Sequence, residues 1–230
     1  GEHKLLCGDA TKADDFKALL GDELVDMTFT DPPYNVNYAN TAKDKMRGKN
    51  RPIMNDNLGD GFGSFLTDAC TNILTHTKGA VYIAMSSSEL DTLQSAFRAA
   101  GGRWSTFIIW AKNTFTLGRA DYQRQYEPIL YGWRDGADHF WCGARDQGDV
   151  WNVKKPQKND LHPTACEKSG RRARLIELDP KYVDVIVKRW EEFTGKKATR
   201  LEEGDMFNRV DSNRDSAPDQ TVGGPSSDAP

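Results

Sequence analysis

The feature that constrains this chain most is a short strand-like segment that is followed by two consecutive prolines. Residues 25–30 alternate in polarity and are rich in residues that favour strands, which predicts a β-strand. Pro32 and Pro33 follow almost directly. Proline lacks a backbone N–H and restricts the residue before it, so neither a strand nor a helix continues through this pair. The chain must therefore turn where the strand ends, with Asp31 and Tyr34 on either side of the prolines.

Strand-like and helix-like segments alternate along most of the chain. Further strands are predicted at residues 80–84, 104–110, 128–133 and 172–176. Helices are predicted at 11–20 with Thr11 as cap, at 62–74, at 88–100, and after Asp179 as N-cap with Pro180 in the first position. Residues 35–58 and 135–163 are expected to be loops or irregular. The alternation predicts an α/β fold with a mainly parallel sheet flanked by helices.

Length and composition place the chain among globular proteins. Its 230 residues suffice for a sizeable domain, and 37% of them are hydrophobic. No run of eighteen apolar residues exists and the first residues lack signal-peptide features, so we expect a cytoplasmic protein without membrane segments. The four cysteines show no Cys-x-x-Cys spacing and are expected to be free and structural. They are Cys7, Cys70, Cys142 and Cys166.

The net charge of −3 conceals an uneven distribution. Residues 211–230 hold four Asp and one Arg, a net of −3, and are rich in Ser, Pro and Gly, which predicts a disordered acidic tail over 209–230. Residues 41–51 hold five basic residues and one acid, a net of +4, and residues 103–174 hold thirteen basic and eight acidic residues, a net of +5. Such local basic segments suit phosphate groups, although an ordinary solvated surface gives the same pattern.

The turn sequence Asp31-Pro32-Pro33-Tyr34 predicts a site for a planar group with an exocyclic amine. It follows a strand, and α/β sheets place their ligands at the carboxyl ends of strands. The Asp31 carboxylate can accept one amino hydrogen and the Pro32 carbonyl the other, while Tyr34 offers a ring on which a base can stack. The prolines keep these groups preorganised. The alternative is a turn that merely ends a strand and carries a surface tyrosine.

In this motif the chain resembles the DNA amino-methyltransferases that use S-adenosylmethionine, in the subgroup whose Asp-Pro-Pro-Tyr motif precedes the cofactor motifs. The resemblance covers roughly residues 3–207 and implies a Rossmann-like methyltransferase fold over residues 1–208. Asp in the first place resembles the adenine-N6 enzymes, since the cytosine-N4 enzymes more often have Ser. Residues 123–133 and 151–163 look most like methyltransferases fused behind a ParB-like nuclease domain, often in phage-derived genes.

The resemblance also assigns cofactor-binding residues. Residues 5–10 resemble the segment whose acid, here Asp9, lies near the cofactor adenine, with Cys7 close by. Residues 175–182 resemble the motif whose acid, here Glu177, binds the cofactor ribose, with Asp179 just after it. An acid at the carboxyl end of a parallel strand is the usual acceptor for ribose hydroxyls. His162 and Thr164 belong to a segment similar to the one that leads into the first cofactor-site helix; we expect His162 to shape a turn rather than act as a base.

One part of the family pattern is missing. The family carries a glycine-rich loop, Phe-x-Gly-x-Gly, which should lie after Thr164 and before the ribose motif. Here residues 165–170 follow directly, and they resemble the end of the helix behind that loop. One strand–helix unit, roughly 30 residues, is therefore expected to be missing at the 164/165 junction. If the gene has lost this unit, the sheet lacks a central strand; if the unit is absent only from this form of the chain, the family activity is expected to stand. The glycines of residues 59–63 follow no apolar strand, and we interpret them as a helix-entry loop.

The resemblance implies a site-specific methyltransferase that acts on double-stranded DNA. A flipped-out adenine would lie against Asp31, Pro32, Pro33 and Tyr34, with Asn35 shaping the pocket, and its N6 would displace the methyl group directly. Neither a cysteine nucleophile nor a metal is needed, and His139 and Cys142 lack partners for a metal site. Eight basic side chains are the expected DNA contacts: Lys43, Lys45, Arg47, Lys49, Arg51, Arg119, Arg124 and Arg145.

Several alternatives stay open at this point. Without its glycine loop the chain could be an inactive relative that only binds DNA. Cytosine-N4 methylation and RNA-directed methylation are disfavoured by the motif but are compatible with the fold. The sequence reveals neither the recognition site nor whether the chain forms a homodimer.

Overall fold

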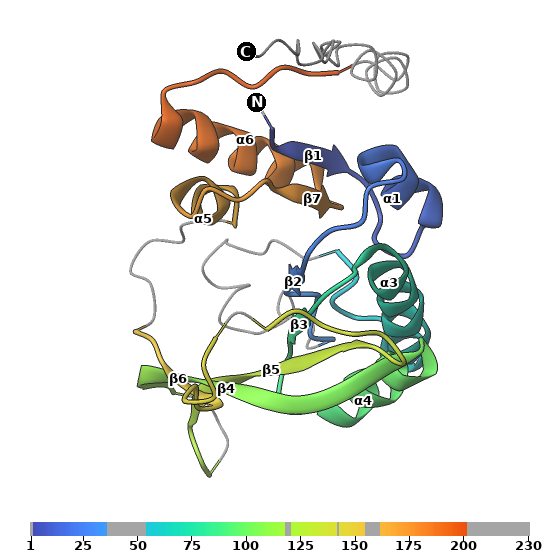
Figure 1. Cartoon of the computed structure of the whole chain (residues 1–230). Coiled ribbons are helices and arrows are strands. Elements are labelled where there is room, and N and C mark those ends of the chain that lie inside the picture. Colours follow the sequence, from blue (N-terminus) through green and yellow to red (C-terminus); the bar gives the residue numbers. More distant parts are fainter. Residues whose placement is uncertain (1, 36–53, 118–120, 142, 155–161, 202–230) are drawn as a thin grey trace, which may run out of the picture. The chain divides into compact units, whose positions relative to one another are not determined.

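The computed structural model describes residues 2–35, 54–117, 121–141, 143–154 and 162–201, apart from the side chains of Thr116 and of residues 162–164. The chain divides into one compact unit over Gly1–Lys196 and a second over Lys197–Pro230. Every described helix and strand lies in the first unit (Figure 1).

The larger sheet contains five strands in the order β2-β3-β5-β4-β6. The strands are β2 (Thr28–Thr30), β3 (Val81–Ala84), β4 (Gly102–Thr116), β5 (Arg124–Arg134) and β6 (Val150–Asn152). The β2–β3 and β4–β6 pairings are parallel, whereas β5 is antiparallel to both β3 and β4. The β4–β5 ladder extends well beyond the predicted strands at 104–110 and 128–133.

A smaller sheet pairs β1 (Lys4–Cys7) with β7 (Arg174–Glu177) in parallel, so that Cys7 lies opposite Glu177. Three of the five strand pairings in the described part of the chain are therefore parallel, and the predicted α/β fold is confirmed. The described strands divide into two sheets, and residues at the carboxyl ends of β2 and β7 line the same cavity.

Three helices share one hydrophobic core with the larger sheet: α1 (Ala13–Leu20), α3 (Phe62–His76) and α4 (Leu90–Ala99). Strand alternation directs Ile83 and Leu130 into this core, whereas their neighbours Ala84 and Ile129 join a small second cluster with Ile108. The smaller sheet is tied to the main core because its partly buried Leu6 and Ile176 pack against it. Helix α1 contacts β1, β7 and α3, so it connects the smaller sheet with α3.

The carboxyl-terminal part of the unit contains α5 (His162–Lys168) and α6 (Pro180–Thr194), which pack against each other. The predicted start of α6 is confirmed, because the Asp179 side chain accepts a hydrogen bond from the Lys181 backbone N–H at 2.9 Å. Gly195, with φ at 70°, ends the helix in the left-handed conformation. The helix-entry interpretation of residues 59–63 is also confirmed, because the short 3-10 helix η2 (Gly59–Gly61) leads directly into α3.

Four local predictions are corrected by the structure. Thr11 does not cap α1: its N–H and hydroxyl both donate to Asp9 Oδ1, at 2.9 and 2.8 Å, and Lys12 is the N-cap. The strand predicted at residues 25–30 is shorter, since Val25 forms only an isolated bridge to Thr77. The segment 135–163 contains β6 because parallel pairing with β4 orders it, and His162 begins a helix instead of a turn.

Candidate functional site

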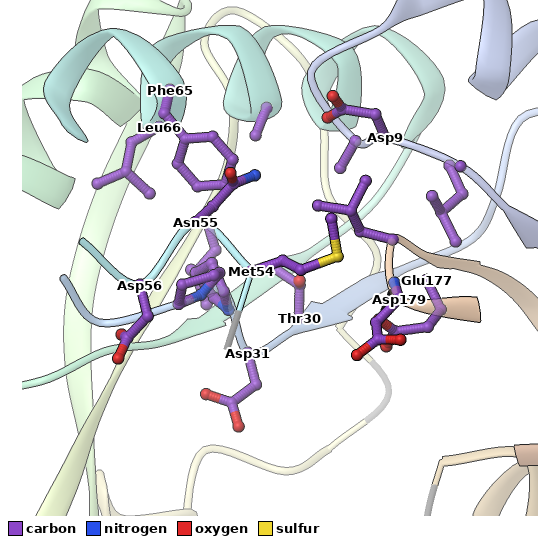
Figure 2. A pocket seen from close by; sticks show the side chains of 18 of the residues that line it. Asp9, Thr30, Asp31, Met54, Asn55, Asp56, Phe65, Leu66, Glu177 and Asp179 are labelled. Atoms are coloured by element: carbon purple, nitrogen blue, oxygen red, sulfur yellow. Dashed lines mark hydrogen bonds between the residues drawn. The ribbon is translucent and has the colours of Figure 1, made fainter. Parts of the chain in front are cut away.

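A cavity of about 450 Å³ lies where the carboxyl ends of β2 and β7 and the loop after β1 approach one face of α3. Figure 2 shows Glu177 and Asp179 together on one side of it, Asp31 apart from them, and Phe65 and Leu66 on α3. The volume suits a drug-sized or cofactor-sized ligand. The polar groups come mainly from loops at strand ends, whereas the apolar wall comes from Phe65, Leu66, Ala69, Cys70 and Ile73 of α3.

The Pro-Pro turn forms one wall of this cavity. Thr30 ends β2, and the next four residues line the pocket. Asp31 is exposed, and its Oδ1 accepts a hydrogen bond from the Tyr34 hydroxyl at 2.6 Å. The Tyr34 backbone N–H donates to Asp56 Oδ1 at 3.2 Å. The turn therefore presents a carboxylate whose orientation is fixed by a neighbouring phenol.

A second wall is acidic and is organised by the start of α6. Glu177 ends β7, and its Oε1 accepts a hydrogen bond from the Asp179 N–H at 2.9 Å. Asp179 in turn caps α6, as described above. A carboxylate offers about four acceptor positions, so the bond to Asp179 leaves Glu177 able to accept from a ligand diol. Residues 177–179 and 182 of this region all line the cavity.

The loop after β1 completes the site. Asp9 lines the cavity, its carboxylate accepts the two bonds from Thr11, and its N–H donates to Asp15 Oδ2 at 2.6 Å. Gly8 lies in close contact with the same acid, because a Cβ added there would lie 2.8 Å from Asp15 Oδ2. A larger residue at position 8 would displace Asp15 and with it the backbone of Asp9.

The thiol in the cavity wall is not set up as a nucleophile. Cys70 lies on α3 with 2% of its surface exposed, and burial raises its pKa to about 12. A thiolate is therefore disfavoured at neutral pH. Among the described residues no cluster of three His, Cys, Asp or Glu side chains could hold a metal ion. No helix in the described ranges is long and apolar enough to span a membrane.

The structure brings most of the ten predicted catalytic and cofactor-binding residues together at the cavity. Seven of the predicted residues line it: Asp9, Asp31, Pro32, Pro33, Tyr34, Glu177 and Asp179. Cys7 lies outside the lining; it is exposed, and its Sγ donates to the Leu178 carbonyl at 3.9 Å. His162 and Thr164 lie in α5, whose residues do not line the cavity, and nothing further is described of their side chains.

The predicted DNA contacts can be located only in part. Six of them lie outside the described residues: Lys43, Lys45, Arg47, Lys49, Arg51 and Arg119. Arg124 is exposed at the start of β5, and its Nη1 donates to the buried Ser86 hydroxyl at 3.0 Å just after β3. Since β3 lies between β2 and β5, Arg124 is at the same edge of the sheet as Asp31. Arg145 is exposed in a turn and does not line the cavity.

Sequence reasoning missed Met54, Asp56 and the apolar face of α3 as parts of the site. Asp56 is only 4% exposed although it lies in the polar run Asn55-Asp56-Asn57. Polar residues in a predicted loop give no local sign of burial, so only the long-range bond to Tyr34 reveals this acid. The face of α3 carries helical periodicity, but periodicity alone does not tell a core from a cavity wall.

No protein-family model matches this chain, and no curated protein matches it in sequence. Solved structures match its fold. The complex of M1.HpyAVI with SAM aligns with a TM-score of 0.57 at 14% identity, over 81% of this chain and 98% of that one. TTHA0409 from Thermus thermophilus, described as a candidate DNA modification methylase, aligns with a TM-score of 0.54 at 15% identity, over 84% of this chain and 95% of that one. Its complex with S-adenosyl-L-methionine aligns with a TM-score of 0.53 at 16% identity, over 86% of this chain and all of that one.

At such low identity these matches concern the fold alone. They agree with the strand and helix arrangement built above, and they include two proteins crystallised with the same cofactor. The chain therefore has the α/β fold of DNA methyltransferase structures.

Proposed function

We propose that this chain binds S-adenosylmethionine and transfers its methyl group to the exocyclic N6 of a flipped-out adenine in DNA. One observation carries the proposal: the turn suited to an amine and the acid suited to a ribose line a single cavity of about 450 Å³. The fold is that of structures solved with the cofactor. Asp as the first residue of the turn supports adenine over cytosine.

The acids of the second wall fit the cofactor's ribose and adenine. Glu177 would accept hydrogen bonds from the ribose hydroxyls, because it ends a parallel strand and keeps acceptor positions after its bond to Asp179. Asp9, held by Thr11, would lie near the cofactor adenine. S-adenosylmethionine, when bound, supplies an electrophilic methyl group on a positively charged sulfur.

The Pro-Pro turn would hold the target amine. Asp31 accepts one amino hydrogen and the Pro32 carbonyl accepts the other, which directs the nitrogen lone pair out of conjugation. The Tyr34 ring stacks on the base. The nitrogen would take the methyl group that the cofactor supplies, with the bonding electrons left on the cofactor sulfur, and the amine would release one proton to Asp31 or to water. No covalent enzyme intermediate is required, in keeping with the raised pKa of the Cys70 thiol.

Arg124 would contact a DNA phosphate beside the target base. It lies at the same sheet edge as Asp31, and the bond to Ser86 restrains its guanidinium. The basic residues at 43–51 would contact the same strand of DNA, in keeping with their net charge of +4 over residues 41–51.

Replacement of Asp31 by alanine tests the proposed chemistry. Without the acceptor for the amine, the rate of methyl transfer should fall on the order of 1,000-fold. DNA binding should be largely retained, because phosphate contacts dominate affinity. The transfer of a tritiated methyl group measures the rate, and a gel-shift assay measures DNA binding. Asp22→Ala, which makes the same substitution at an exposed position, is the control. Undiminished methylation in the Asp31→Ala protein would refute the mechanism.

A second candidate is an inactive relative that binds DNA without the cofactor. It is favoured by the division of the described strands into two sheets at the cavity, as expected if a central strand–helix unit is missing at the 164/165 junction. Calorimetric titration with S-adenosylmethionine separates the two candidates. Micromolar binding supports the enzyme, and absence of binding alongside intact DNA affinity supports the relative.

A further inference from the structure

Two sets of hydrogen bonds, here called links, join the Pro-Pro turn and Asn35 to residues 56–59, which precede α3. The Asn35 Oδ1 accepts from the backbone N–H of Leu58 at 2.9 Å and of Gly59 at 3.1 Å. The Asp56 Oδ1 accepts from the N–H of Tyr34 at 3.2 Å. Both links connect positions more than twenty residues apart in the sequence. We call Asn35 and Asp56, with these three bonds, the brace.

The backbone at Asn35 is suited to this role. Its φ is 57°, in the left-handed region, which asparagine tolerates better than other side chains. Directly after Tyr34, this residue places its side-chain oxygen at the start of η2. The N-cap residue of η2, Leu58, has no side-chain hydrogen bond of its own. Asn35 therefore satisfies N–H groups at this helix start from outside the helix.

The second half of the brace is a buried acid. Asp56 is 4% exposed, and a carboxylate withdrawn from water is tolerated only when it is hydrogen-bonded. Its bond to the Tyr34 N–H fixes the backbone from which the Tyr34 ring projects. The Tyr34 hydroxyl then reaches Asp31 Oδ1 at 2.6 Å. A continuous chain of bonds thus runs from the entry to α3 to the carboxylate at the cavity.

We propose that Asn35 and Asp56 are positioning residues that hold Tyr34, and through it Asp31, in place against the α3 wall. Neither needs to touch a substrate. The need for such a brace follows from geometry, because a displacement of about 1 Å at reacting groups can reduce a rate roughly 100-fold. Only the activity readout of this proposal rests on the proposed function.

Amide hydrogen exchange of four purified variants, each compared with wild type, tests the brace without any activity. In Asp56→Ala the Tyr34 N–H should exchange at least about tenfold faster, and Asp56→Asn, which keeps an acceptor oxygen, should restore its protection. In Asn35→Gly, which permits the same backbone conformation, the Leu58 and Gly59 amides should lose protection. Asn57→Gly, an exposed position in the same segment, is the matched control and should change none of these amides.

The position of Tyr34 is read separately by NMR of ¹³C-labelled tyrosine. Wild type should show one sharp Tyr34 ring signal, whereas Asp56→Ala and Asn35→Gly should show a broadened or shifted one. Methyl transfer by both variants should fall roughly 100-fold in kcat, with cofactor affinity unchanged, because Asp9 and Glu177 are held by other bonds. Asp56→Asn should recover most of the rate.

The outcomes separate the two proposals. Faster exchange with an unmoved Tyr34 ring and an unchanged kcat overturns the positioning role. An equal loss of cofactor affinity in both variants also overturns it, since the damage would then be general. A wild-type chain that transfers no methyl group refutes the proposed function. In that case amide hydrogen exchange and the Tyr34 ring signal still test whether the brace holds Tyr34 in place.

Discussion

The two sheets of this protein are built from similar elements but are packed to different degrees. In the larger sheet and its helices, Phe62, Leu66 and Ile83 have 1% of their surface exposed, and Leu93 and Phe97 have none. In the smaller sheet, β1 and β7 contain no buried residue, and neither does α6. The side that would hold the target base thus has a closed core, whereas the side that would hold the cofactor does not.

The smaller sheet leaves apolar surface partly uncovered. Parallel strands are normally covered on both faces, and β7 carries the apolar Leu175 and Ile176, which are only half-buried. Helix α6 likewise has an amphipathic sequence, yet Tyr182 is 37% and Phe193 47% exposed. We propose that a strand and helix missing at the 164/165 junction would have covered this apolar surface.

A matched pair of leucine substitutions measures this difference and has the largest expected effect. Leu93→Ala, in the closed core, should lower the free energy of unfolding by about 3–5 kcal/mol, because it leaves a cavity among buried neighbours. Leu175→Ala, on half-buried β7, should lower it by about 1–2 kcal/mol. Urea denaturation of both variants gives the values. Equal losses would mean that the smaller sheet is as tightly packed as the larger one.

Glu177→Gln tests whether the less packed side still binds the cofactor. The neutral amide accepts weaker hydrogen bonds than a carboxylate, so the dissociation constant for S-adenosylmethionine should rise about 10- to 100-fold. Stability should hardly change, because Glu177 is only half-buried and its bond to Asp179 can persist through the amide oxygen. Calorimetry measures the affinity, with the exposed Glu192→Gln on α6 as control. An unchanged affinity would remove Glu177 from the proposed site.

Local sequence signals predicted most of the helices and strands and the turn at the cavity. Pro32 and Pro33 end β2 through their own backbone constraints, and Asp179 caps α6 through a bond two residues away. These features depend on neighbours in the sequence, and the sequence therefore suffices to locate them. Asp31 and Glu177 were both expected at the ligand site because ligands bind at the carboxyl ends of parallel strands.

Long-range pairing accounts for most of what sequence reasoning missed. β6 is ordered by its pairing with β4, and its three residues are exposed and too few to show an alternating pattern. β4 and β5 continue past their apolar parts, where Lys112 forms an ion pair with Glu127 across the ladder. The buried Asp56 accepts a hydrogen bond from Tyr34, 22 residues away. None of these partners can be read from a window of a few residues.

The smallest expected effect concerns how the less packed side is held together. His3 Nδ1 accepts from the Ala173 N–H, so Nε2 carries the proton that is donated to Glu167 Oε2 at 2.5 Å. Trp190 on α6 donates to the same oxygen at 3.4 Å. The hydrogen bond from His3, followed by that from Trp190, holds the pKa of Glu167 below its ordinary value of 4.5. Polar contacts therefore tie α5 to α6 where buried apolar contacts are few.

The sign of the pH effect follows from this lowered pKa. A carboxyl with a depressed pKa in the folded state contributes stability above about pH 4.5, which is lost as the pH falls through the folded value. Acidification should therefore loosen α5 from α6 before the larger sheet unfolds. The difference in fluorescence between wild type and Trp190→Phe reports this step. Glu167→Gln should abolish the pH dependence of the Trp190 fluorescence, whereas Glu192→Gln should leave that pH dependence unchanged. Identical acid titrations for wild type and Glu167→Gln would show that packing, and not this tie, holds the two helices together.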